Sequence, residues 1–127
     1  MRIRKKGLAL VETPKGFLVV ASKNKIFTLP GGGIDKGESR RRATMRELRE
    51  ETGLRSESVN YLFSYKGNRW ADNRGRITIN YAKVFLIKVS GKAKPKSEIK
   101  YIRYWKPGSK LKISRRTQWI FNKYLNL

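Results

Sequence analysis

Residues 29–54 read LPGGGIDKGESRRRATMRELREETGL. The three consecutive glycines predict a loop with a permissive backbone. Between residues 40 and 52 there is neither glycine nor proline, and residues that favour helices dominate. Ser39 is suited to the N-cap of a helix and Gly53 to the position after its end. We therefore expect a short strand over 26–29, a glycine-rich loop, and a helix over 40–52.

Acidic residues are grouped on one face of this predicted helix. Glu47 lies three residues before Glu50 and four before Glu51, and such spacings bring Cβ atoms to about 5–6 Å. Carboxylates at that range repel each other, and they also oppose the helix dipole when they lie in its last turns. A divalent cation would remove both costs, because Mg²⁺ prefers hard oxygen ligands. Arg46, four residues before Glu50, is placed to hold that carboxylate by an ion pair.

Most of the chain outside this segment is strongly basic. The 127 residues contain 31 Lys and Arg against 9 Asp and Glu, which gives a net charge of +22. A field of this sign favours polyanionic partners such as nucleic acids and nucleotides. An acidic helix face usually serves only for solvation, but the scarcity of acids elsewhere and the preceding glycine loop favour a site that binds metal and phosphate.

The composition excludes several kinds of chemistry. Cysteine and histidine are absent, so there is no disulfide, thiolate nucleophile or imidazole base. The apolar fraction of 39% is enough for the core of one domain. No apolar run approaches the roughly 18 residues of a membrane span, and no signal-type region follows the basic start. We expect one domain over residues 1–127, in the cytoplasm, without a membrane partner.

The acidic segment resembles the Nudix box, G-x5-E-x7-R-E-U-x-E-E-x-G-U, in which U is aliphatic. Every fixed position is matched, by Gly32, Glu38, Arg46, Glu47, Leu48, Glu50, Glu51, Gly53 and Leu54. The chain is therefore identified as a member of the Nudix hydrolase family of the MutT-like kind. The resemblance implies an α+β Nudix fold, an α/β/α sandwich with a central mixed β-sheet. It also implies hydrolysis of a nucleoside diphosphate linked to a further group, with Mg²⁺ or Mn²⁺ as cofactor.

The resemblance implies roles for the matched residues. Glu50 and Glu51 are implied as the principal metal ligands, and Glu47 as a ligand or as the group that orients or deprotonates the attacking water. Arg46 is implied to orient the glutamates. A glutamate before a late strand reaches the metals in many relatives, and Glu98 is similar to it in position, although it could simply balance nearby lysines. The implied catalytic set is Arg46, Glu47 and Glu50, and the implied metal set is Gly32, Glu38, Glu47, Glu50, Glu51 and Glu98.

The remaining elements follow from hydrophobic patterning and turn residues. We expect strands over 7–12, 17–21, 59–65, 77–89 and 101–105, a polar loop over 68–74 with a hairpin turn at 72–75, a basic loop over 91–97, and a last helix capped by Ser114. Arg69 and Arg74 are candidates for phosphate contacts, and Trp70 and Tyr81 for stacking on a base. Solvation for the arginines, and sheet packing for the aromatic residues, are the ordinary alternatives.

The sequence leaves the substrate open. No motif typical of ADP-ribose, dinucleoside polyphosphate, NADH or coenzyme A hydrolases follows the box, so a nucleoside triphosphate or modified nucleotide, cleaved to the monophosphate and pyrophosphate, is the default. The basic balance suggests a second hypothesis, removal of pyrophosphate from RNA 5′ ends. A third, a non-catalytic RNA-binding module, is disfavoured by the intact box. The oligomeric state is not predicted.

Overall fold

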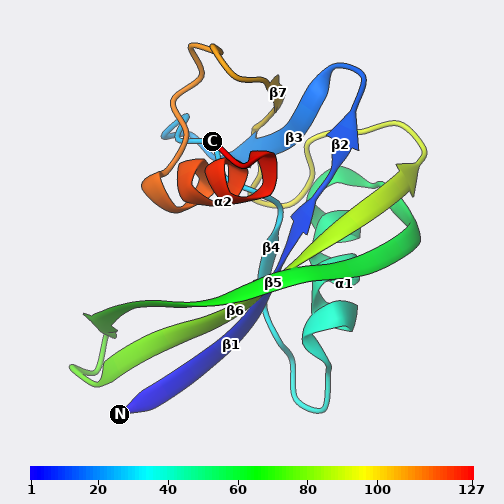
Figure 1. Ribbon diagram of the computed structural model, residues 1–127. Helices are drawn as coiled ribbons and strands as arrows, with labels where there is room; N and C mark the ends of the chain where they lie inside the picture. Colours follow the sequence, from blue (N-terminus) through cyan, green and yellow to red (C-terminus); the bar gives the residue numbers. More distant parts are fainter.

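The structure, a computed structural model, describes residues 1–127. Two β-sheets and two helices make up the chain (Figure 1). The elements are β1 (Arg2–Leu10), β2 (Glu12–Thr13), β3 (Gly16–Ala21), β4 (Gly31–Gly33), α1 (Arg40–Thr52), β5 (Arg55–Ala71), β6 (Ile77–Ser90), β7 (Tyr101–Trp105) and α2 (Arg115–Leu125). Neither helix is long and apolar enough to cross a bilayer.

The larger sheet is mixed, as the sequence predicts. Its strand order is β4-β1-β6-β5, and β1 runs parallel to β6 but antiparallel to β4. The smaller sheet is antiparallel, in the order β2-β3-β7. Because β1 pairs with the short strand β4, it carries the glycine-rich segment at the edge of the larger sheet. This edge positions the predicted site.

Two separate cores cover the two faces of the sheets. Leu8 in β1 belongs to one core with Ile120 and Phe121 of α2. The neighbouring residue Ala9 belongs to the other core with Leu48 of α1. Successive residues of a strand point to opposite faces, so the two helices lie on opposite sides of the larger sheet. The predicted α/β/α arrangement is confirmed.

Helix α1 begins and ends where the sequence predicts. The Ser39 side chain accepts a hydrogen bond from the Arg42 N–H at 3.1 Å, which satisfies a free donor of the first turn. Gly53 adopts φ 76°, in the left-handed region that favours glycine, and its N–H bonds to the Arg49 carbonyl. Both caps of the box helix are therefore properties of its local sequence.

Two sequence expectations are wrong. The segment 26–29 forms no strand: Thr28 bridges to Val20 in β3, and Phe27 bridges to Ile113, so its backbone groups are shared between two neighbours. The segment 68–71 is strand and not loop, because β5 continues to Ala71 in register with β6. Pairing with β6 supplies the hydrogen bonds that its polar composition did not suggest.

The end of the β5–β6 hairpin projects beyond both helices (Figure 1). The predicted turn over 72–75 is present there, and the Asp72 carboxylate accepts hydrogen bonds from the Arg74 and Arg76 N–H groups. The start of β1 runs alongside β6, with Arg2 opposite Thr78. We call residues 2–5, 66–71 and 77–80 with this turn the distal arm.

Candidate active site

Arg46 lies at the centre of the carboxylates of the box. Its Nε donates to Glu38 at 2.8 Å, and its Nη1 donates to Glu47 at 2.8 Å and to Glu50 at 3.2 Å. Its Nη2 donates to the Gly33 carbonyl at 3.2 Å. One guanidinium group thus links Glu47 and Glu50 of α1 to Glu38, which precedes the helix, and to the backbone of β4. Its proximity also lowers the pKa of Glu38 to about 2.

Glu51 differs from the other glutamates because it is buried and has no cation within ion-pair distance. Only 6% of the residue is exposed, and its Oε1 accepts a hydrogen bond from the Gly31 N–H at 2.9 Å. Burial is the main cause that raises the pKa of Glu51 to about 7, and the Gly31 hydrogen bond opposes this rise. The negative charges of Glu47, Glu98 and Glu50 raise the pKa further.

The backbone of Gly32 is in close contact with Glu47. A Cβ at position 32 would lie 2.8 Å from Glu47 Cδ and 3.0 Å from Glu47 Oε1, so no other residue fits there without displacing the carboxylate. A buried carboxylate without a cation and a second one held against the backbone of β4 make a set of hard oxygen atoms, which suits Mg²⁺ or Mn²⁺. The residues present therefore fit a divalent cation. In their present rotamers, however, no three acidic side chains converge on one point.

Glu98 lies in the loop before β7, as expected. Its charge is near enough to raise the pKa of Glu51, and the loop is attached to the end of α1 by hydrogen bonds from the Lys94 and Lys96 N–H groups to Thr52 and Glu51. The structure therefore brings Glu98 toward the box glutamates without any sequence motif that joins them.

A cavity of about 160 Å³ adjoins Gly31, and it contains two basic residues that the sequence did not single out. Lys6 pairs with Gly33 in the β1–β4 ladder, and Arg116 lies in the first turn of α2. The guanidinium carbon of Arg116 is 4.3 Å from the centre of the Tyr65 ring, which also lines the cavity. Burial is the main cause that lowers the pKa of Lys6, aided by the charges of Arg4 and Arg116 and opposed by that of Glu51.

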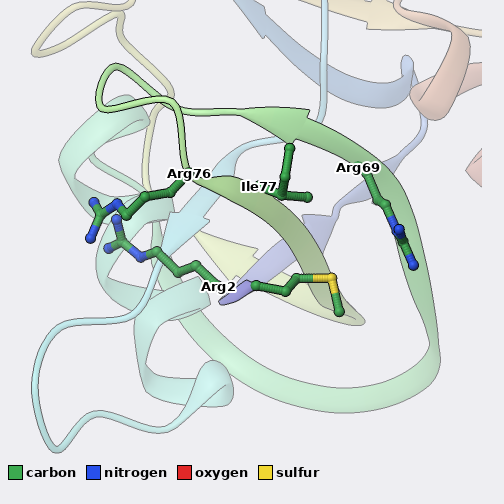
Figure 2. Close-up of a pocket in the computed structure, with 5 residues that line it drawn as sticks. Arg2, Arg69, Arg76 and Ile77 are labelled. Atoms are coloured by element: carbon green, nitrogen blue, oxygen red, sulfur yellow. The ribbon is translucent and has the colours of Figure 1, made fainter.

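The proposed substrate residues are not gathered at the glutamates. Arg69 lines an open hollow on the distal arm (Figure 2), and Trp70 and Arg74 line a second one. Neither hollow contains a glutamate of the box. Tyr81 lines another hollow, beside Arg40 at the start of α1. Trp105 in β7 is a core residue, and the centre of its ring lies 4.3 Å from that of Phe121, on which it stacks.

The match to a family model extends over nearly the whole chain. The model of the NUDIX domain matches residues 3–124. The chain belongs to the Nudix family. Among solved structures, a Nudix hydrolase family member from Chromobacterium violaceum superposes with a TM-score of 0.80 at 34% identity, over 98% of this chain and 77% of that one. A MutT protein from Bacillus halodurans has a TM-score of 0.80 at 20% identity, over 98% and 83% of the two chains, which shows the shared fold.

Among curated relatives, an RNA pyrophosphohydrolase of Rhodopseudomonas palustris is 31% identical over all of this chain and 75% of its own length. Other relatives match only locally. Nudix hydrolase 26 of Arabidopsis thaliana is 44% identical over 55 residues, which are 35% of this chain and 26% of that protein. The chain thus spans about a quarter of the length of that relative.

Proposed function

We propose that this Nudix protein hydrolyses a phosphoanhydride bond of a nucleotide with the help of a bound divalent cation. The observation that carries the proposal is Glu51, a buried carboxylate among other carboxylates, without a cation partner, beside a basic cavity. A purely structural site would leave this charge uncompensated, at a cost in stability. The names of the relatives support the same class of reaction. Residues 1–127 are proposed to act as one domain, and the family match supports this.

Glu47, Glu50 and Glu51 would hold the cation, with Glu38 and Glu98 as outer contacts and the Gly32 carbonyl completing the set. The identity of the metal, Mg²⁺ or Mn²⁺, is part of the proposal. When bound, it supplies charge neutralisation for the phosphates and a lowered pKa for a water molecule. This agrees with the absence of histidine, because no imidazole base is then required.

The chain's own residues position the reacting groups. Arg46 is a positioning residue, because it fixes Glu47 and Glu50 relative to β4. Glu47, held against Gly32, is placed to orient the attacking water or to take its proton. Lys6 and Arg116 are placed to pair with phosphate oxygens on the other side of Gly31.

Two substrates remain in the proposal. A nucleoside triphosphate or modified nucleotide, cleaved to the monophosphate and pyrophosphate, is the first candidate, because its phosphates match the charges of Lys6 and Arg116 in the cavity beside Gly31. The 5′ end of an RNA is the second candidate, and it is favoured by the net charge of +22 and by the relative named RNA pyrophosphohydrolase. The same glutamates would serve both substrates.

A release assay tests the proposal. Purified protein with Mg²⁺ or Mn²⁺ is incubated with a panel of nucleoside triphosphates and with 5′-triphosphorylated RNA, and phosphate and pyrophosphate are measured. We expect release from at least one substrate, lost in Glu47→Gln and retained in Glu57→Gln, whose exposed carboxylate only accepts a hydrogen bond from Ser90. No release from any substrate with either metal, or equal release by Glu47→Gln, would contradict the proposal.

A further inference from the structure

Basic side chains alternate along β1 and form a row that begins beside the active site. Arg2, Arg4 and Lys6 are two residues apart, so they point to the same face, about 6.6 Å from one to the next. At the inner end, Lys6 shares a cavity with Gly31 and Arg116. The Arg4 guanidinium lies against Gly33, because a Cβ there would be 3.2 Å from its Nη2. The row therefore starts at the strand that contacts the box glutamates.

At the outer end of the row, Arg2 lines an open hollow of about 560 Å³ on the distal arm. The other residues of this hollow are Trp70, Asp72, Asn73, Arg74 and Arg76. The one carboxylate is already paired, because Asp72 Oδ2 lies 2.8 Å from Arg76 Nε and 3.8 Å from Arg2 Nη1. The hollow therefore has an excess of positive charge. Figure 2 shows Arg2 and Arg76 extending to the same side, with Arg69 turned away from them.

The strand register places aromatic residues beside this row. Trp70 is opposite Thr78, which is opposite Arg2, so Trp70 and Arg2 share a face. The Trp70 residue is 41% exposed, and its ring pairs with no other aromatic ring. By the same pairing Tyr65 shares a face with Lys6 at the inner end. One face of the arm thus carries an exposed indole, a line of cations and a second ring beside the active site.

The ion pairs of Asp72 account for Arg2 and Arg76 but not for the rest of the row. Arg4, Lys6 and Arg74 form no ion pair, and cations at this spacing repel each other. The arm contributes little to either core, since Ile3, Trp70 and Ile77 are exposed and Ile79 is its one buried apolar side chain. A polyanion along the row would relieve the repulsion, and guanidinium groups match phosphates in charge and geometry.

We propose that this face binds the single-stranded body of an RNA whose 5′ phosphates lie at the glutamates. We call the residues Arg2, Arg4, Lys6, Trp70, Arg74 and Arg76 the β1 track. This inference rests on the proposed function and selects its RNA candidate. Arg2 lies about 13 Å along the strand from Lys6, so it contacts a nucleotide beyond the one that is hydrolysed. Trp70 stacks on a base, an interaction that tolerates any sequence.

Binding of a 5′-triphosphorylated RNA of about ten nucleotides tests the track. Fluorescence anisotropy is measured in EDTA, over a range of salt concentrations, for the wild type and for the double variant Arg2→Gln/Arg74→Gln. For single strands the salt slope is about 0.7 per phosphate contact, so the variant should bind roughly tenfold or more weakly at 0.1 M salt, with a slope lower by about 1.4. Trp70→Ala should weaken binding roughly tenfold, and Trp70→Phe should recover most of it.

The matched control removes the same charge elsewhere. Lys110→Gln/Lys112→Gln alters two exposed lysines in the loop between β7 and α2, at the opposite end of the molecule from the arm (Figure 1). This control should keep the wild-type slope. The track is rejected if the Arg2/Arg74 variant binds like the wild type, or if both double variants weaken binding equally. Circular dichroism and thermal unfolding of each variant confirm that it is folded.

The binding test and the test of hydrolysis fail independently. Binding is measured without metal and without turnover, so a track that binds RNA is detected even in a protein that hydrolyses nothing. Conversely, a wild-type protein that hydrolyses free nucleotides but binds RNA independently of the track residues retains the proposed function and loses only the track.

Discussion

The substitution Glu51→Gln separates the loss of stability caused by the buried charge from the part that this charge plays in metal binding. The pKa of this group rises from 4.5 in its ordinary state to about 7 in the folded protein. Between these values the folded state binds a proton that the unfolded state has released, so the stability of the metal-free protein falls as the pH rises from 4.5 to about 7. Above pH 7 this loss of stability has reached its full size, and below pH 4.5 there is no loss.

The size of this loss follows from the shift of the pKa. A difference of about 2.5 units, at 1.36 kcal/mol per unit, corresponds to roughly 3 kcal/mol as an upper bound. Glutamine has the shape of glutamate, keeps an oxygen that can accept from the Gly31 N–H, and carries no charge. We therefore expect metal-free Glu51→Gln to be more stable than the wild type by about 1–3 kcal/mol at pH 8, and equally stable at pH 4.5.

Urea unfolding in EDTA, followed by tryptophan fluorescence at both pH values, measures this difference. Addition of Mg²⁺ or Mn²⁺ at pH 8 should stabilise the wild type by mass action and leave the variant almost unchanged. Glu57→Gln, which alters an exposed carboxylate, should unfold like the wild type in every condition. If Glu51→Gln were less stable than the wild type at pH 8 without metal, the reasoning about its buried charge would be refuted.

Three further substitutions test the site and the core. Arg46→Lys removes the guanidinium fork that holds Glu38, Glu47 and Glu50. Turnover, measured as initial rates, should fall about 10–100-fold, because residues that orient metal ligands have effects of this size. The melting temperature should change little. Gly32→Ala displaces the Glu47 carboxylate and should lower turnover at least about tenfold, with activity per folded protein as the readout. Trp105→Ala empties the ring stack on Phe121 and should cost about 3–5 kcal/mol of unfolding free energy in denaturant titration.

The residues next to one another in the sequence are sufficient to predict the box helix and the loop before it. The N-cap at Ser39 and the left-handed Gly53 depend on their immediate neighbours, so the sequence predicts both ends of the helix. The segments that were predicted wrongly depend on distant partners. Residues 68–71 are strand only because β6 pairs with them, and Phe27 is held by Ile113. Composition within a short window contains no information about such partners.

In the candidate site, too, residues close together in the sequence are predictable, and residues that meet only in the fold are not. Spacing on one helix was enough to group Glu47, Glu50 and Glu51, and the structure adds that Glu51 alone is buried. Lys6 and Arg116 could not be found in this way, because they are far apart in the chain and meet only through the cavity beside β4. The alternation of Arg2, Arg4 and Lys6 was a usable signal, but it required extending the first strand to residue 2.

Strand β5 is one of the two edge strands of the larger sheet, and it is 17 residues long. An open edge of that length can template the addition of another chain, which leads to aggregation. The register shifts between Ser56 and Ser58, Tyr61 and Phe63, and Lys66 and Arg69 interrupt its regular backbone. The cations at 66 and 69 also repel a second copy of the same basic edge. The irregular pairing and these cations thus disfavour the addition of a second copy along an unusually long strand edge.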